Sequence, residues 1–477
     1  MVSRLFLPLV FALVAVGAFW QSQVTDVDSN RPPLTVEAAA PRLSTPLLSG
    51  RRLPEVLQGP EAQRRLVATL DEAVAELPAG SCLAVNENWE TRYAHQADLP
   101  LVPASTQKLL TAAAALAVLG PDYVFTTRVM AQSGPVDGVV DGNVWLVGAG
   151  DPLLMTADYA DRFSTPLPYT DLNLLADQIA AADVDTITGA VVGDESYFDD
   201  LRWVATWPER FRAGAQNQSG PLSALSVNDG FSQWDSENTA NGLNTAAEDP
   251  AAFAAAFFDD LLEDRSLRIY QRASSGLAPE DALVELASID SPPVAILVAQ
   301  MLQASDNTTA ELLVKALASF SYGHGTTEQG LQEMSDALGE IFLQEIVAAD
   351  GSGLDPGNLV TCSLLVELLG DTGGWDATVL RSGLALAGST GTMRNRLVGS
   401  SGEGRVRAKT GTLNDVVSLA GVVETLEGRT LTFALISNAD PLPENLRQLH
   451  DQIVLDLVAF PVGPPLALLE PFPVLVS

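Results

Sequence analysis

The chain has 477 residues, 47% of them hydrophobic, and a formal net charge of −34 at pH 7. This length and hydrophobic content predict a globular protein of two to four domains with a sizeable core. The acidic excess repels phosphate groups and therefore argues against a nucleic-acid-binding protein. The three histidines and two cysteines form no metal-ligand pattern and no Cys-x-x-Cys motif, so we predict neither a metal site nor a redox centre.

The N-terminus predicts export. Within residues 1–22, Arg4 precedes sixteen uncharged and mostly apolar residues, the pattern of a signal peptide or a membrane anchor. Residues 23–50 are polar and rich in proline, which predicts a linker. We therefore expect the folded part on the cell-wall side of the cytoplasmic membrane, periplasmic or secreted, with N-terminal membrane association and cleavage left open.

Folding is predicted to begin near Arg51. Apolar residues at helical spacing cover residues 65–77, and residues 81–96 predict two strands joined by a turn. An alanine- and leucine-rich run then extends from Pro103 to Gly120. Glycine followed by proline ends a helix, so Ser105 is predicted at the N-terminus of a helix of about four turns.

Residues 121–290 have a different texture, in which short strand-like runs alternate with turns around one predicted helix. They predict a mainly β segment of one or two subdomains. Helical spacing resumes at Pro292. Residues 415–438 then predict a β-hairpin, and residues 443–460 predict a last amphipathic helix.

Lysine is rare in this chain, since only three of the 26 basic residues are lysines: Lys108, Lys315 and Lys409. Lys108 follows Ser105 by three residues, which places both side chains on one helix face, about 5–6 Å apart. A buried lysine can lose its proton and accept one from a serine, whereas arginine cannot. Alone, this pattern also fits an N-cap serine with a surface lysine. Lys315 lies four residues after Glu311, which predicts an ordinary ion pair along one helix.

Two further motifs change the interpretation of Ser105. Ser305-Asp306-Asn307 lies between two helical segments, and Lys409-Thr410-Gly411 lies on a predicted strand before the hairpin. Ser-x-x-Lys, Ser-Asp-Asn and Lys-Thr-Gly, in this order, are the motif set of penicillin-binding proteins and serine β-lactamases. Their joint occurrence predicts a serine acyltransferase site.

With these motifs the chain resembles the class C low-molecular-mass penicillin-binding proteins, D-alanyl-D-alanine carboxypeptidases that also act as endopeptidases on peptidoglycan. The resemblance covers about residues 51–460. Further stretches share it: "GAGDPLL" from Gly148, "GAVVGDESYFD" from Gly189, "SALSVNDG" from Ser223, "DGSGLDPGNLVT" from Asp350 and "AGSTGTMRNRL" from Ala387.

The resemblance implies an α/β (α+β) fold, the transpeptidase domain of serine β-lactamases and penicillin-binding proteins split by a large insert. Residues 51–120 and 291–460 would then form the two parts of the catalytic domain. Residues 121–290 would be the inserted module, and residues 461–477 would be a C-terminal tail. The family implies no cofactor, with peptidoglycan peptides as substrate and β-lactams as inhibitors.

The resemblance also assigns the first catalytic roles. Ser105 would be the acylated nucleophile and Lys108 its base. Ser305 would pass a proton to the leaving amine, while Asn307 would hold the substrate amide.

The remaining residues of the motifs would hold the substrate. Lys409 would add positive charge to the cleft, and Thr410 and Thr412 would contact the terminal carboxylate of the substrate. Gly411 belongs to the same substrate-binding strand, and Asp306 would orient its own loop beside the substrate. The backbone N–H groups of the nucleophile and of Thr412 would form the oxyanion hole.

Two alternative functions stay open: a β-lactamase or esterase of the same fold, and a catalytically idle wall-binding protein. The long insert counts against the first, and so does the absence of a Glu-x-x-Leu-Asn pattern between Ser305 and Lys409. The intact motif set counts against the second. For Cys82 and Cys362, a disulfide and two buried free thiols are both compatible with the sequence.

Overall fold

The structure is a computed structural model, and it describes residues 53–163, 166, 168–212, 217–235, 244–279, 283–371 and 374–461. The predicted signal peptide or anchor, the linker and nearly all of the tail lie outside these residues. Gln58–Pro464 forms one compact unit. Within the described ranges, no helix is both long and apolar enough to cross a membrane.

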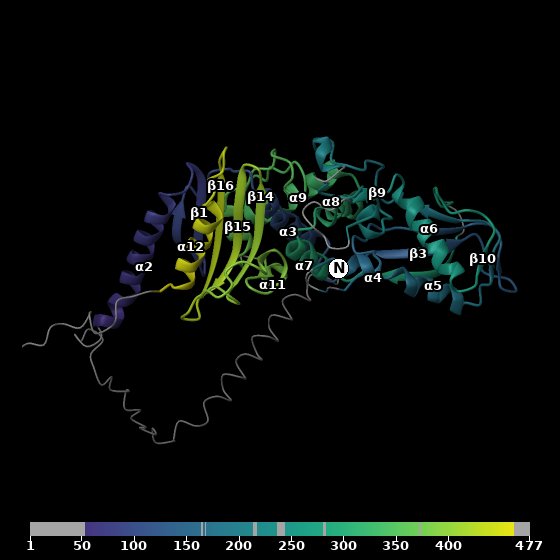
Figure 1. The fold of residues 1–477 in the computed structure, drawn as a ribbon, viewed down its shortest axis with the longest axis horizontal. Coiled ribbons are helices and arrows are strands. Elements are labelled where there is room, and N and C mark those ends of the chain that lie inside the picture. Colours follow the sequence, from purple (N-terminus) through teal and green to yellow (C-terminus); the bar gives the residue numbers. More distant parts are fainter. Residues whose placement is uncertain are drawn as a thin grey trace, which may run out of the picture. The chain divides into compact units, whose positions relative to one another are not determined.

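A six-stranded antiparallel sheet is built from both ends of the chain (Figure 1). Its strands, in spatial order, are β13 (Ala385–Leu386), β14 (Val406–Leu413), β15 (Val416–Glu424), β16 (Thr430–Asn438), β1 (Gly80–Glu87) and β2 (Glu90–His95). The predicted hairpin is therefore confirmed as β15 and β16. The early strand pair is confirmed as well, and it joins the sheet next to β16 because β1 pairs with it.

Successive side chains along each strand point to opposite faces of this sheet, and both faces are buried. On β1, Leu83 and Val85 pack into one core with α2 (Leu53–Val74) and α12 (Leu446–Val458). Cys82 and Ala84, which point the other way, pack into the core that holds the remaining helices of this sheet. These helices are α3 (Lys108–Val118), α7 (Val294–Ala304), α8 (Asn307–Tyr322), α9 (Thr327–Phe342), α10 (Cys362–Leu368) and α11 (Thr378–Gly383).

Residues 121–290 form sheets of their own. A five-stranded sheet has the order β11 (Ser274–Ser275), β7 (Val191–Asp194), β5 (Val144–Val147), β3 (Thr126–Ala131) and β12 (Val284–Asp290). The smaller sheets pair β10 (Arg268–Ile269), β6 (Thr186–Ile187) and β4 (Val139–Val140), and β8 (Phe231–Gln233) with β9 (Thr245–Ala246).

The same segment contains more helix than the sequence predicted. Its helices are α4 (Ala157–Ala160), α5 (Leu172–Ala181) and α6 (Pro250–Glu263). α5 and α6 pack their apolar residues against the five-stranded sheet in a separate core (Figure 1). These helices are present because a sheet with one apolar face needs a covering layer, and α5 and α6 supply it.

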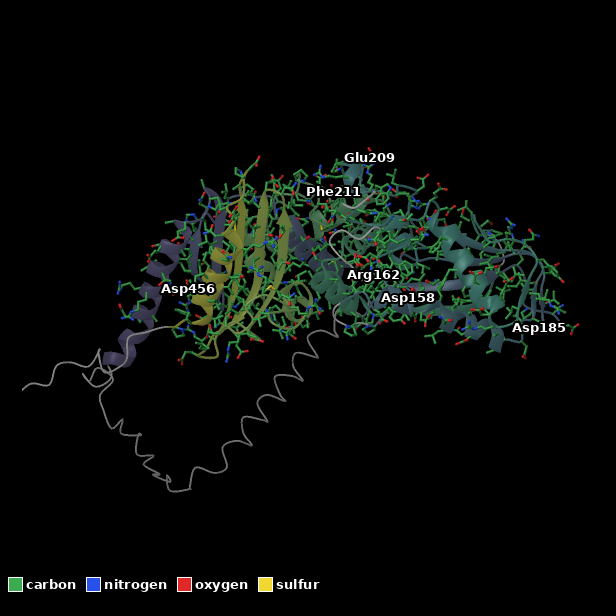
Figure 2. All side chains as sticks on the ribbon, in the orientation of Figure 1. Asp158, Arg162, Asp185, Glu209, Phe211 and Asp456 are labelled. Carbon is green, nitrogen blue, oxygen red and sulfur yellow. A yellow bond between two sulfur atoms is a disulfide. The ribbon has the colours of Figure 1, made fainter. Side chains whose placement is uncertain are left out.

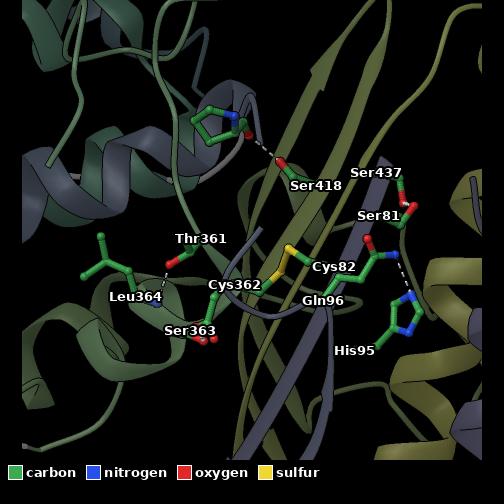
Figure 3. The surroundings of a disulfide bond; sticks show 12 residues. Ser81, Cys82, His95, Gln96, Thr361, Cys362, Ser363, Leu364, Ser418 and Ser437 are labelled. Atoms are coloured by element: carbon green, nitrogen blue, oxygen red, sulfur yellow. Dashed lines mark hydrogen bonds between the residues drawn. A yellow bond between two sulfur atoms is a disulfide. The ribbon is translucent and has the colours of Figure 1, made fainter. Parts of the chain in front are cut away.

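Cys82 and Cys362 form a disulfide, which decides between the two possibilities left by the sequence (Figure 3). It joins β1 to the first residue of α10, with 280 residues of sequence between the two cysteines. Both cysteines are fully buried. Disulfides persist in oxidising compartments, so this bond agrees with a position outside the cytoplasm.

Candidate active site

Ser105 lies on a short 3₁₀ turn, η1 (Ala104–Gln107), that leads directly into α3. The preceding Ala104 is fully buried and has a left-handed backbone, with φ of 49°. Non-glycine residues adopt this conformation rarely, and it is concentrated at functional sites. The backbone of Gly353, which approaches the Ala104 carbonyl too closely to leave room for a side chain, helps to hold the turn.

Lys108 is the first residue of α3, and its side chain is completely buried. Its Nζ donates to Ser105 Oγ at 3.2 Å, to Asn307 Oδ1 at 2.6 Å and to the Ser352 carbonyl oxygen at 2.6 Å. Desolvation lowers the pKa of Lys108 to about 8, against the opposing influence of nearby carboxyl groups. A minor fraction of this amine is therefore neutral near physiological pH and able to accept the serine proton, a larger fraction than for an ordinary lysine.

The Ser-Asp-Asn motif forms the connection between α7 and α8. Ser305 ends α7 in the left-handed conformation, with φ of 60°, and Asp306 is the N-cap of α8. The Asp306 carboxylate accepts from the Thr309 N–H and from Gln300 Nε2, so it ties the loop to both helices. This geometry leaves the side chains of Ser305 and Asn307 on the cleft.

The Lys-Thr-Gly motif lies on β14 and completes the site. Lys409 is fully buried and donates to Ser305 Oγ at 2.8 Å and to the Thr410 carbonyl at 2.7 Å. Burial, and then the charge of Lys108, lower the pKa of Lys409 well below its usual range. The hydroxyls of Thr410 and Thr412 follow on the same strand and line the cleft.

Gly411 permits β14 to pass directly beside the backbone of Ser105. A Cβ at this position would lie 2.9 Å from the Pro103 carbonyl oxygen and 3.0 Å from the Ser105 nitrogen. The Pro103 carbonyl also accepts a 2.6 Å hydrogen bond from Ser418 on the neighbouring strand β15, drawn in Figure 3. Any side chain at Gly411 would therefore displace the Ser105 backbone from the strand.

The motifs converge on one cleft of about 1020 Å³. The predicted residues that line it are Ser105, Ser305, Asn307, Thr410 and Thr412. The segment 121–290 also supplies part of its wall: Thr206, Pro208, Arg210, Phe211 and Gln218. Phe211, labelled in Figure 2 beside Glu209, belongs to the short helix η2 (Glu209–Phe211). The insert is thus a structural part of the cleft, which the sequence did not reveal.

Asn307 shows how closely the insert is attached to this site. While its Oδ1 accepts from Lys108, its Nδ2 donates to the Gln218 carbonyl at 2.6 Å. The next residue, Thr308, accepts at its hydroxyl from the Gly220 N–H at 3.0 Å. The orientation of the Asn307 amide therefore depends on residues from both parts of the fold.

Two buried carboxyl groups behind Lys108 were missed by sequence reasoning. Glu311 accepts from the N–H groups of Gly351 and Ser352 at 2.8–3.1 Å. Asp350 accepts from the N–H of Gly353 at 2.7 Å and from the indole of Trp207 in the insert at 2.9 Å. Together they hold the loop whose Ser352 carbonyl binds Lys108.

This loop carries the "DGSGL" stretch that begins at Asp350. Burial raises the pKa of both Glu311 and Asp350. The glycines on either side of Ser352 were the one sequence feature that could have indicated this loop's role, because glycine allows a loop backbone to approach other residues closely.

Lys315 does not form the helical ion pair with Glu311 that its spacing predicted. Its ammonium group pairs with Asp199 of the insert and donates to the Leu201 carbonyl at 3.0 Å. Glu311 is used by the loop described above, so it is not available to Lys315. The prediction was wrong because both side chains are buried, and tertiary packing decides which partner each one meets.

Comparisons with known proteins agree with this architecture. The model of the D-Ala-D-Ala carboxypeptidase 3 (S13) family matches residues 66–244 and 235–457. A D-alanyl-D-alanine carboxypeptidase of Actinomadura sp. (strain R39) is 30% identical, over 90% of this chain and 88% of the relative. The chain belongs to the S13 family of D-Ala-D-Ala carboxypeptidases. It is therefore a class C low-molecular-mass penicillin-binding protein and a serine-type hydrolase, as its motifs predicted.

Two solved structures show the same fold. Penicillin-binding protein 4 of Haemophilus influenzae aligns with a TM-score of 0.67 and 22% identity, over 81% of this chain and 98% of the other. A predatory peptidoglycan endopeptidase of Bdellovibrio bacteriovorus aligns with a TM-score of 0.51 and 18% identity, over 82% of this chain and 94% of the other. The predicted fold class, a penicillin-binding-type α/β domain with a large insert, is confirmed.

The depressed pKa of Lys108 predicts the pH dependence of acylation in this family member. We expect the neutral amine of Lys108 to act as the base for Ser105, so the second-order rate constant for acylation should rise about tenfold per pH unit and level off above about pH 8. Rapid-mixing measurements with benzylpenicillin from about pH 6 to about pH 10 test this. A rate constant that stays flat across that interval would contradict a titrating amine at this position.

Proposed function

We propose that the enzyme cleaves the peptide bond on the carboxyl side of D-alanine in peptidoglycan peptides, through an acyl-enzyme on Ser105. The observation that carries the proposal is the paired contact of the two hydroxyls with the two buried amines. Lys108 Nζ lies 3.2 Å from Ser105 Oγ, and Lys409 Nζ lies 2.8 Å from Ser305 Oγ, in one cleft.

Acylation follows from these contacts. Neutral Lys108 takes the proton of Ser105, and the Ser105 oxygen attacks the D-alanine carbonyl carbon. The backbone N–H groups of Ser105 and Thr412 stabilise the negative charge on the carbonyl oxygen. Ser305, hydrogen-bonded to Lys409, then passes its hydroxyl proton to the leaving amine and takes up the proton that Lys108 removed from Ser105. In hydrolysis, neutral Lys108 takes a proton from the attacking water and returns it to the Ser105 oxygen as the ester bond breaks.

Substrate orientation is assigned to the remaining residues of the cleft. Asn307, held by Lys108 and the Gln218 carbonyl, hydrogen-bonds the peptide amide of the substrate. The hydroxyls of Thr410 and Thr412 bind the carboxylate of the leaving D-amino acid. The same set serves a free D-Ala-D-Ala terminus and a cross-link between two peptides, so we assign both carboxypeptidase and endopeptidase activity to this site.

We further infer that β-lactams acylate Ser105 and that the adduct is hydrolysed slowly. The Haemophilus influenzae relative has been crystallised with a β-lactam, which supports binding in this cleft. We infer that the enzyme acts at the cell wall, outside the cytoplasmic membrane, and that the N-terminal hydrophobic segment exports it. The buried disulfide supports a position outside the cytoplasm.

Labelling with a fluorescent penicillin tests the proposal, with wild type and Ser105→Ala compared by intact mass. We expect a stable adduct of one penicillin on the wild type and no detectable adduct on the variant. Rapid hydrolysis of penicillin without an adduct would instead indicate a β-lactamase. A wild type that neither forms an adduct nor releases D-alanine from a D-Ala-D-Ala peptide would indicate an idle wall-binding protein.

A further inference from the structure

The guanidinium group of Arg447 lies beside the C-terminal end of strand β14. This residue lies in the first turn of α12 and is exposed, and its NH2 donates to Thr412 Oγ1 at 3.2 Å. Thr412 is the exposed hydroxyl that lines the cleft two residues after Thr410. The sequence placed Arg447 in an amphipathic helix and gave it no role.

The guanidinium of Arg447 has no carboxylate partner in the described part of the chain. Ten other arginines form ion pairs there: Arg64, Arg65, Arg92, Arg128, Arg202, Arg265, Arg381, Arg396, Arg405 and Arg429. Arg210 on the wall of the cleft also forms no ion pair within the described residues, but its guanidinium lies over the Phe211 ring, whereas the guanidinium of Arg447 contacts the Thr412 hydroxyl. Its charge is available to a ligand.

A carboxylate bound at Thr412 needs such a charge. Asp415 and Asp440 line the same cleft and repel an anion. Lys409 is fully buried and already donates to Ser305 and to a backbone carbonyl. Its lowered pKa further reduces the positive charge that it can offer. Arginine, in contrast, stays protonated and presents a planar fork that matches a carboxylate.

We propose that Arg447 is a specificity-determining residue that binds the carboxylate of the leaving D-amino acid together with the Thr412 hydroxyl. It thereby selects peptides whose terminal carboxylate is free over peptides in which this group is amidated or esterified. The inference rests on the proposed function, since it requires Thr410 and Thr412 to face the carboxylate of a substrate that acylates Ser105.

The test compares benzylpenicillin, which has a free carboxylate, with its methyl ester. Acylation rate constants are measured for wild type, Arg447→Gln and Arg447→Lys. If Arg447 donates a charge-assisted hydrogen bond to the carboxylate, Arg447→Gln should lower the ratio of the acid rate constant to the ester rate constant by about 10–100-fold. We expect the rate with the ester to change less than about twofold, and Arg447→Lys to retain part of the preference because it keeps the charge but not the fork.

A peptide pair provides a second readout, namely N-acyl-L-Lys-D-Ala-D-Ala and its C-terminal carboxamide. For the peptide with a free carboxylate, Arg447→Gln should raise KM with little change in kcat, because the carboxylate is bound equally in the ground state and the transition state. Arg64→Gln, which removes the same charge from an exposed side chain on α2, is the matched control and should leave the ratio unchanged.

The outcomes separate this inference from the proposed function. Equal losses with acid and ester would assign Arg447 a merely structural role and overturn the inference, and so would an unchanged ratio. In either case a Ser105 adduct on the wild type would leave the proposed function intact. A wild type without any adduct on Ser105 would contradict both.

Discussion

Replacing Lys108 by methionine is expected to lower the rate of Ser105 acylation by penicillin about 10²–10⁴-fold, the range of a lost general base. The neutral amine 3.2 Å from the serine oxygen is the proton acceptor in our proposal, and methionine is an unbranched side chain of nearly the same length without a basic group. The neighbouring amine of Lys409 contacts Ser305 rather than Ser105, so it does not replace the lost base.

Lys108→Arg separates proton acceptance from positive charge. Arginine keeps the charge but does not lose its proton, so this variant should be about as slow as Lys108→Met. Acylation is followed by intact mass over hours, beside thermal unfolding of each variant. In Lys108→Met, the Ser352 carbonyl and Asn307 Oδ1 each lose a buried donor, which should cost about 1–3 kcal/mol of folding free energy without unfolding the enzyme. Labelling at the wild-type rate in either variant would refute Lys108 as the base.

Removing the disulfide has the largest effect that we expect on stability. The double substitution of Cys82 and Cys362 by alanine should lower the free energy of unfolding by about 3–5 kcal/mol. The bond closes a loop of 280 residues between β1 and α10, so its loss frees a large part of the unfolded chain. The two buried sulfurs also leave a small cavity in the core that contains α3 and α10.

Guanidinium denaturation measures this loss, with and without a thiol reductant. Wild type should lose stability when reductant is added, whereas the double variant should be insensitive to it. The single variant Cys362→Ala is the matched control, because it breaks the bond while leaving one cysteine in place. Equal reductant sensitivity in wild type and double variant would show that the bond contributes nothing in solution.

The sequence alone was enough to predict the catalytic motifs and several secondary-structure elements of this protein. The three motifs could be recognised from the sequence because each is a run of adjacent or nearly adjacent residues, and Ser105 and Lys108 share a helix face by spacing alone. Alternation of apolar residues predicted the hairpin of β15 and β16, and a glycine–proline stop predicted the end of α3. These features depend on backbone periodicity, which any short window of sequence contains.

Tertiary structure alone decided which distant residues meet. Lys315 had a good local partner at helical spacing, yet it pairs with Asp199, 116 residues away, because burial places that carboxylate beside it. Three other contacts depend in the same way on strand order and loop packing: the disulfide, the Ser352 carbonyl on Lys108 and the hydrogen bond from Arg447 to Thr412. Periodicity specifies which face of an element is buried, but the partner on that face is set by the packing of the whole chain, which no local pattern encodes.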